Sequence, residues 1–145
     1  MQIINRKATF NYQITEQIEA GIVLLGSEVK SIRLGKASIG ESYIAEVEGE
    51  LFLINSHIND YAFASQFKHD PKRKRKLLLH TKQINKLIGK IEQGFSLVPM
   101  KIFFNKKNFA KIIIGLGKGK KLFDKRNDIK KRDENRYLQR HGHDN

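Results

Sequence analysis

The chain has 145 residues, with 28 Lys and Arg against 15 Asp and Glu, a formal net charge of +13. A single domain of this length can bury a core, and so large a positive charge indicates a polyanionic partner, with nucleic acid favoured over an anionic membrane surface. The apolar runs are too short to span a bilayer and there is no cysteine, which excludes disulfides and thiolate zinc sites and is compatible with a cytoplasmic protein.

The first part of the chain predicts strands and one short helix. Apolar residues alternate with polar ones over residues 9–26, which indicates two half-buried strands joined by a turn at residues 16–17. Ser27 is a candidate N-cap for a helix that runs to Arg33 and stops at Gly35.

The middle of the chain predicts a hairpin and a second helix. Residues 43–47 and 51–54 flank Gly49, which can adopt the positive φ of a tight turn. After a short buried run at residues 77–79, Thr81 can cap a helix with apolar residues at i, i+3, i+4 and i+7. That apolar face comprises Ile84, Leu87, Ile88 and Ile91.

A second hairpin joins residues 97–104 to residues 109–116, with Pro99 indicating an edge or a bulge. The pattern therefore gives about six strands and two short flanking helices. Many short antiparallel strands in one small domain favour a mainly β fold, a small antiparallel barrel similar to oligonucleotide-binding (OB) folds.

Positive charge is densest before the second helix. Six of the nine residues 68–76 are Lys or Arg, and an apolar run follows at once, so these cations should sit on a folded body. A charge run is usually a solvated face, but a second basic run near the C-terminus favours a nucleic-acid partner. The aromatic residues near the basic runs are few, which favours readout of shape and backbone over base stacking.

The composition changes near the C-terminus. Residues 117–145 contain ten basic and five acidic residues and few apolar ones, too little apolar surface to offset the entropy of ordering. We therefore predict an OB-like RNA-binding barrel over residues 1–116 and a basic tail over residues 117–145 that is disordered alone and folds on binding. The glycine-rich residues 115–120 lack the spacing of a phosphate-binding loop and are interpreted as a flexible hinge.

Catalytic chemistry has no convergent pattern. The carboxylates are scattered singly over predicted strands and turns, and those of Glu46, Glu48 and Glu50 fit a solvated face. The first three histidines are too far apart for a metal motif, while the terminal His141 and His143 are a chance cluster or a weak metal binder. We predict a non-enzymatic protein without a cofactor or metal site.

Several long sequence blocks carry a resemblance to one family. Among them are Gly26-Ser27-Glu28-Val29-Lys30-Ser31-Ile32-Arg33, Lys76-Leu77-Leu78-Leu79-His80 and Gly119-Lys120-Lys121-Leu122-Phe123-Asp124-Lys125-Arg126. With Asn5-Arg6-Lys7-Ala8 and shorter blocks they resemble, in order over nearly the whole chain, the signature of the bacterial SsrA-binding proteins, SmpB. The resemblance implies an OB-like barrel with a tail that is unstructured in isolation.

The resemblance also implies a function. Family members bind the tRNA-like domain of transfer-messenger RNA (tmRNA) and bring it, alanylated and with elongation factor Tu, to ribosomes stalled on messages without a usable end. In this process, trans-translation, the protein occupies the decoding region and its tail becomes helical in the empty mRNA channel. The nascent peptide is tagged for proteolysis and the ribosome is rescued.

Individual positions match family motifs. The resemblance implies an RNA surface at Glu19, Leu78 and Lys111, although core packing explains Leu78 equally well. Arg6 and Lys7 are expected phosphate partners beside that surface, and the basic loop adds Arg73, Arg75 and Lys76. The tail is expected to contact the ribosome through Gly119, Lys120, Lys121, Asp124, Lys125, Arg126, Lys130, Lys131 and Arg132. Phe123 and the final residues 141–145 depart from the family pattern.

Two other functions fit a basic barrel. A structural ribosomal protein would co-purify stoichiometrically with all subunits, whereas an adaptor would associate with stalled ribosomes and one tRNA-like RNA. A barrel nuclease would hydrolyse RNA with a divalent metal, and the absence of a carboxylate cluster in the sequence counts against it.

Overall fold

The computed structural model describes residues 2–60, 69–120, 126 and 129–133. Its helices are α1 (Ala8–Asn11), α2 (Gly26–Arg33) and α3 (Thr81–Glu92). Its strands are β1 (Ile3–Ile4), β2 (Tyr12–Ile22), β3 (Ala37–Ser38), β4 (Tyr43–Val47), β5 (Glu50–Ile54), β6 (His57–Ile58), β7 (Arg75–Leu78), β8 (Ser96–Phe104) and β9 (Ala110–Gly119). The predicted mainly β fold with short helices is therefore confirmed.

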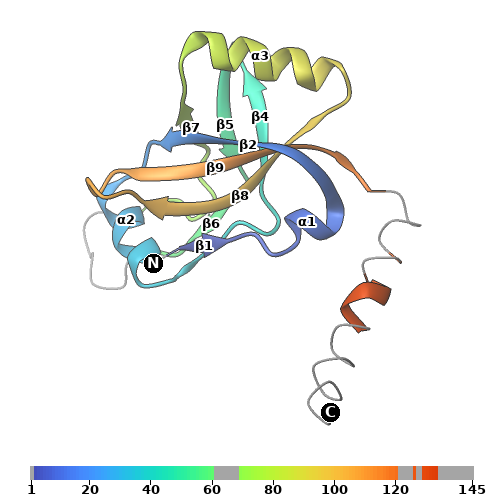
Figure 1. Ribbon diagram of the computed structural model, residues 1–145. Coiled ribbons are helices and arrows are strands. Elements are labelled where there is room, and N and C mark those ends of the chain that lie inside the picture. The colour runs from blue at the N-terminus through green and yellow to red at the C-terminus, as the bar shows by residue number, and fades with distance from the viewer. Residues whose placement is uncertain (1, 61–68, 121–125, 127–128, 134–145) are drawn as a thin grey trace.

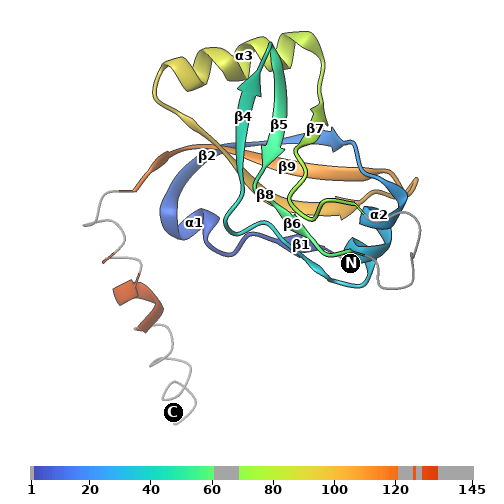
Figure 2. The same cartoon turned by 180° about the vertical axis from the view of Figure 1, so that it is seen from behind.

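The strands form one strongly curved antiparallel sheet. The order is β1-β8-β9-β2-β7-β5-β4, and β3 pairs separately with β6. The long strand β2 pairs with β9 along most of its length and with β7 at its end, so it joins the two halves of the sheet. The sheet curls until β4 contacts β8, which gives the small OB-like barrel (Figures 1 and 2).

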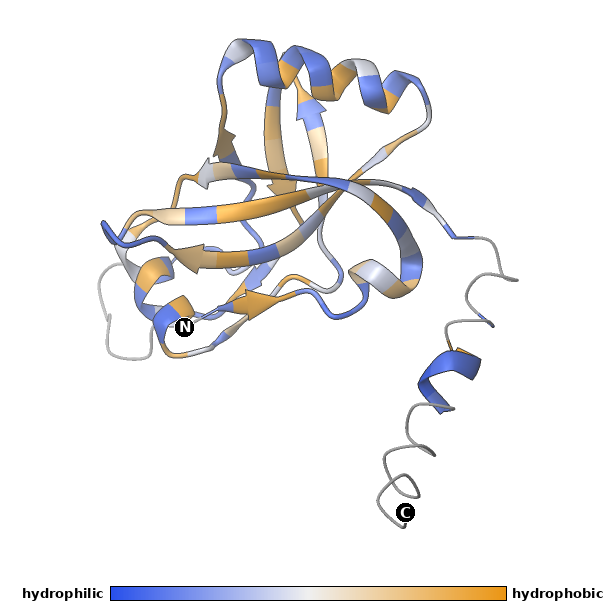
Figure 3. Cartoon of the chain, in the orientation of Figure 1, coloured by the Kyte–Doolittle hydropathy of each residue, from blue (hydrophilic) through white to orange (hydrophobic). Residues whose placement is uncertain are grey.

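The core fills the inside of this barrel. Fully buried side chains come from β5, β7, β8 and β9, and include Leu53, Leu77, Ile102 and Ile112. Helix α3 lies across one end of the barrel (Figure 1), with Ile84 and Leu87 buried and Ile88 and Ile91 partly buried against the core, as the apolar periodicity predicts. In Figure 3 the strands carry most of the apolar residues, and the short helix at residues 129–133 is mainly hydrophilic.

The turns of both hairpins follow the prediction. Glu48 and Gly49 have φ of 52° and 80°, the left-handed pair that a two-residue hairpin turn requires. The register of β8 with β9 shifts between Pro99 and Lys101, so the proline marks a bulge. Both predicted helices are present, but their N-caps are Leu25 and His80 instead of the predicted Ser27 and Thr81.

The prediction of two strands within residues 9–26 is wrong. Residues Tyr12–Ile22 form a single strand, and no turn interrupts it at residues 16–17. The register against β9 shifts between Ile14 and Glu16, so a β-bulge leaves Thr15 unpaired. At the bulge three consecutive polar residues, Thr15, Glu16 and Gln17, are exposed. Their polarity resembles that of a turn, which explains the wrong prediction.

The predicted hinge at residues 115–120 is also wrong. Gly115, Gly117 and Gly119 lie in β9 and pair with β2. A Cβ atom at Gly117 would lie 2.4 Å from the carbonyl oxygen of Gln13, because β2 approaches closely beside its bulge. Strand β9 therefore continues past residue 116, and the backbone N–H of Lys120 still donates to the Asn11 carbonyl at 2.9 Å.

Among the described helices, none has the length and apolar character needed to cross a membrane.

Substituting Gly117 by Ala should destabilise the barrel by about 1–3 kcal/mol, because the new methyl group collides with backbone that cannot rotate away. Gly119→Ala is the matched control in the same strand, since no atom lies within 4 Å of a Cβ built there. Urea denaturation followed by circular dichroism measures both. Equal midpoints for the two variants would contradict the close approach of β2.

Candidate nucleic-acid interface

Three neighbouring strands build a pocket on the outer face of the barrel. Gly21 on β2 is opposite Leu78 on β7 and opposite Lys111 on β9. The pocket has a volume of about 440 Å³ and is lined by Glu19, Ala20, Gly21, Leu78, Leu79, His80, Gln83 and Lys111. The structure thus brings together the three residues that the family resemblance implied.

Leu78 belongs to the surface and not to the core. The side chains of β7 alternate, so Arg75 and Leu77 are buried while Lys76 and Leu78 point outward. Leu78 is 53% exposed. A Cβ at Gly21 would lie 3.1 Å from the Leu78 Cβ, so the glycine gives this leucine room to lie against β2. Leu78 is therefore free to contact a ligand that enters the pocket.

The pocket combines groups that suit RNA. The Lys111 ammonium can neutralise a phosphate, and the Glu19 carboxylate can accept hydrogen bonds from a base or a 2′-hydroxyl group. Leu78 offers an apolar contact for a base or a sugar. His80 and Gln83, at the start of α3, add polar groups on the same rim. Groups that a nucleotide could contact therefore line the pocket.

Arg6 and Lys7 lie elsewhere. They precede α1, which leads into the first residue of β2, whereas Glu19 and Gly21 lie near the last residue of β2. Lys7 forms an ion pair with Glu41 and lines a different pocket, of about 240 Å³, with Asn11 and Tyr12. The expectation that Arg6 and Lys7 stand beside the Glu19 surface is wrong, because most of the extended strand β2 lies between the two places.

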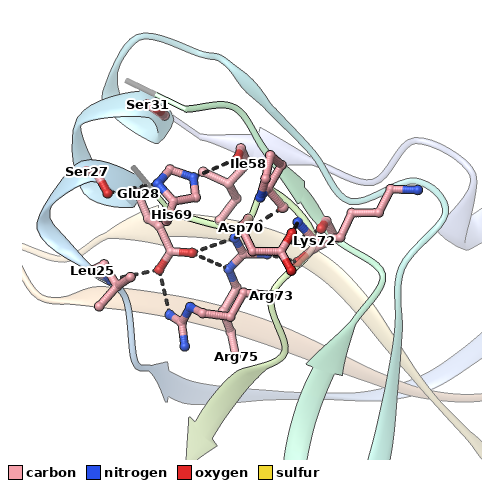
Figure 4. A network of polar contacts seen from close by, with 12 residues as sticks. Leu25, Ser27, Glu28, Ser31, Ile58, His69, Asp70, Lys72, Arg73 and Arg75 are labelled. Carbon is pink, nitrogen blue, oxygen red and sulfur yellow. Dashed lines mark hydrogen bonds and ion pairs between the residues drawn. The ribbon is translucent and has the colours of Figure 1, made fainter. Parts of the chain in front are cut away.

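Arg75 is a structural residue, which corrects its assignment to the RNA surface. Its side chain is fully buried, and its Nε donates to Glu28 Oε2 at 2.7 Å (Figure 4). Its Nη1 donates to Ser56 Oγ at 2.9 Å. The cause is the alternation of β7, which turns every second residue of the basic loop inward.

Arg73 shares the same carboxylate. Its Nη2 donates to Glu28 Oε1 at 2.6 Å, which holds most of this side chain against α2 (Figure 4). The Arg73 side chain retains 31% exposure, so its role on the RNA surface is limited by this pairing. Lys76 points outward from β7 toward Glu50, at 3.9 Å, and shares the outer face with Leu78.

The Glu28 carboxylate is charged at neutral pH. Its burial alone would raise its pKa, but hydrogen bonds from Arg73, from the Leu25 backbone and from Arg75 outweigh burial and lower the pKa. Burial lowers the pKa of Arg75, but guanidinium titrates so far above neutrality that it stays charged. The pair is therefore a buried ion pair with its hydrogen bonds satisfied.

Comparisons with known proteins agree on one family. Residues 2–144 match the family model described as SmpB protein. The chain belongs to the SmpB family. It is 57% identical over 130 residues to the SsrA-binding protein of Bradyrhizobium sp. (strain BTAi1), covering 89% of this chain and 83% of that one. It is 58% identical over 130 residues to that of Rickettsia canadensis, covering 89% and 86%.

A solved structure also matches this chain and supports the same family. The SmpB-family fold of this chain is similar, with a TM-score of 0.70 and 48% identity, to a chain in "tmRNA-SmpB: a journey to the center of the bacterial ribosome". The match covers 83% of this chain and 85% of that one. The barrel architecture is therefore shared with an experimentally determined SmpB structure.

The SmpB tail motif lies partly outside the described residues. Its members Lys121, Asp124 and Lys125 are among the residues that the structure does not describe. Gly119 ends β9 and Lys120 is fixed to α1 through its backbone. Arg126, Lys130, Lys131 and Arg132 are exposed, and residues 129–133 are helical. The Arg132 guanidinium lies 5.0 Å from the centre of the Phe10 ring.

The remaining polar clusters give no metal site. Within residues 2–60, 69–120 and the described part of the tail, no three His, Asp or Glu side chains converge as metal ligands. His69 is buried, and its Nε2 donates to the Ile58 carbonyl at 2.8 Å while Nδ1 lies 2.8 Å from Ser27 Oγ. This histidine fixes the basic loop to α2.

Substituting Glu28 by Gln should destabilise the protein by about 3–5 kcal/mol, because Arg75 is left buried without a counter-charge. Glu16→Gln is the matched control, because it removes the exposed pair with Lys86 (3.1 Å) and should cost less than about 1 kcal/mol. Denaturant midpoints measure both. A Glu28→Gln variant as stable as Glu16→Gln would contradict the structural role of the pair.

The pH dependence of stability tests the same pair. Because the pKa of folded Glu28 is below the ordinary carboxyl value of about 4.3, its contribution is complete above that pH. The contribution is lost as the pH falls through the lowered pKa. The stability difference between wild type and Glu28→Gln should therefore narrow progressively below about pH 4. A constant difference down to the acid transition would contradict this assignment.

Proposed function

We propose that this protein is the RNA-binding adaptor of trans-translation. It binds the tRNA-like domain of tmRNA and delivers it to stalled ribosomes, which leads to tagging of the nascent peptide and rescue of the ribosome. The carrying observation is the convergence of Glu19, Leu78 and Lys111, from three strands, in one exposed pocket. Membership of the SmpB family and similarity to an SmpB chain from a study of tmRNA on the ribosome support it.

The barrel would hold the RNA by its backbone and by shape. Lys111 and Lys76 supply positive charge on the outer face, and Leu78 and Glu19 contact the parts of a nucleotide that a phosphate-binding cation does not reach. Arg75 takes no direct part, because Glu28 occupies it inside the fold. A specific RNA surface thus lies on a rigid sheet.

The tail would act on the ribosome. We propose that it starts after Lys120, where β9 and its hydrogen bond to α1 end, and that it becomes helical in the empty mRNA channel. Its exposed cations, among them Lys130, Lys131 and Arg132, would pair with ribosomal RNA phosphates. The delivered complex includes alanylated tmRNA and elongation factor Tu, and the work takes place in the cytoplasm.

The protein would act without catalysis, as a binding adaptor. The chemistry of tagging then belongs to the ribosome and to tmRNA, while this chain supplies recognition and placement. A nuclease or a structural ribosomal protein would have different partners, so a comparison of RNA affinities separates these functions from the adaptor.

The tRNA-like domain of tmRNA should bind more tightly than an unrelated RNA hairpin of equal length at matched salt. Lys111→Glu should weaken the specific binding by about 1–3 kcal/mol, because it removes a charge-assisted contact and adds repulsion. Lys36→Glu makes the same change in net charge at an exposed position that does not line the pocket, so it controls for the general loss of positive charge. Equal affinity of wild type for both RNAs would overturn the adaptor function.

Truncation after Lys120 separates the two activities. The shortened protein should keep its thermal midpoint and its affinity for the tRNA-like domain, because β9 and the pocket remain complete. It should fail to support peptide tagging on stalled ribosomes in a reconstituted translation system. A large loss of affinity for the isolated RNA would instead place the tail in the RNA-binding surface.

A further inference from the structure

The turn between β8 and β9 displays an aromatic side chain in solvent. Phe109 is 61% exposed, more than any other large apolar residue in the described part of the chain. Exposed lysines, Lys106 and Lys107, stand beside it in the same turn. A phenylalanine in such a position gains little from burial within its own fold, and its ring is accessible to a ligand.

The turn is held in one shape. Asn105 Oδ1 accepts hydrogen bonds from the backbone N–H groups of Lys107 (3.0 Å) and Phe109 (2.9 Å). The backbone N–H of Asn105 donates to the Phe109 carbonyl at 3.0 Å, and that of Asn108 donates to the Asn105 carbonyl at 2.9 Å. Asn108 adopts a φ of 63°, which asparagine tolerates well. Binding through this turn therefore costs little ordering entropy.

Phe109 continues the pocket surface. Side chains alternate along β9, and the inward positions are Ile112 and Ile114, so Phe109, just before the strand, shares the outer face with Lys111. Gly21 on β2 pairs with Lys111 on the antiparallel strand β9. Val23 follows Gly21 by two residues and Phe109 precedes Lys111 by two residues, so the same register places Val23 and Phe109 at corresponding positions. Val23 is 41% exposed. An apolar strip thus runs from Leu78 past Val23 toward Phe109.

The charge around this strip selects the occupant. Lys106, Lys107 and Lys111 flank it, and lysine is depleted in protein–protein interfaces, whereas it is the ordinary partner of phosphate. Aromatic rings displayed beside cations stack on unpaired bases, which offer a π-face of any sequence.

We propose that Phe109 stacks on one unpaired base of the bound RNA, and that Lys106 and Lys107 bind the phosphates on either side of it. This site deepens the proposed function, on which it rests: the RNA surface reaches from the Glu19 pocket to the tip of the β8–β9 hairpin. It requires a ligand with an unstacked base in a loop or bulge, because a base inside a continuous duplex cannot reach the ring. The sequence pattern pointed only to aromatics near the two longest basic runs, and Phe109 lies in neither.

The first test separates stacking from general apolar contact. Phe109→Leu keeps apolar bulk but loses the ring, and it should weaken binding to the tRNA-like domain of tmRNA about 5- to 100-fold, whereas Phe109→Trp should bind at least as tightly as wild type. Tyr43→Leu is the matched control, since it removes another exposed ring, on β4, which pairs with β5 and contributes nothing to the lining of the Glu19 pocket. Full affinity in Phe109→Leu would overturn the proposal.

The second test observes the base directly. The natural chain has no tryptophan, so Phe109→Trp carries a single indole reporter. Stacking should quench its fluorescence when the tRNA-like domain binds, and a fully paired duplex of equal charge should leave the emission unchanged. Quenching by a non-RNA partner instead of by this RNA would identify a protein-docking surface and contradict the assignment.

The third test isolates the lysines. The double variant Lys106→Gln, Lys107→Gln should reduce the slope of log affinity against log salt by about 0.7 for each single-stranded phosphate that is no longer neutralised, whereas Phe109→Leu should leave the slope unchanged.

Lys111→Glu distinguishes failure of the stacking site from failure of the proposed function. If it abolishes specific binding while every hairpin variant binds normally, the function stands and the stacking site falls; if wild type shows no RNA preference, the function itself falls.

Discussion

The buried contact between Glu28 and Arg75 is the interaction on which the proposed RNA-binding face of the barrel depends. It joins α2 to β7, and Ser56 ties the same guanidinium to the segment after β5. Because strand side chains alternate, holding Arg75 inside forces Lys76 and Leu78 outside. A slip of one residue would bury Lys76 and expose Leu77. The ion pair therefore determines which face of the sheet displays the leucine.

The sequence pattern was sufficient to predict the barrel class, the β4–β5 and β8–β9 hairpins and the apolar face of α3, whereas the three pocket residues came from the family resemblance. Hairpins and amphipathic helices are local, so periodicity and turn glycines reveal them. It was not sufficient for Arg73 and Arg75, because five consecutive cations carry no sign of which ones a distant carboxylate will draw inward. That information lies in the pairing of β7 with the rest of the sheet.

The two errors in strand assignment have a common physical origin. The β2 bulge imitates a turn in polarity, and the glycines opposite it imitate a hinge in composition. Each segment is explained by the other: β2 comes close beside its bulge, and Gly117 of β9 has no Cβ atom that would collide with it. Such reciprocal packing between residues about a hundred positions apart leaves no local signal. The position of Phe109 is hidden for a similar reason, since only register shows that it shares a face with Lys111.

The pairing of β2 with β9 also sets a distance. Lys111 lies at one end of the paired segment and Gly119 at the other. Eight extended residues span up to about 26 Å. The barrel thus works as a spacer of fixed length between the pocket and the point where the tail leaves, with the strand pair as its rigid axis. An RNA held in the proposed pocket need not obstruct the tail at the other end, and any insertion within β9 would change the distance between them.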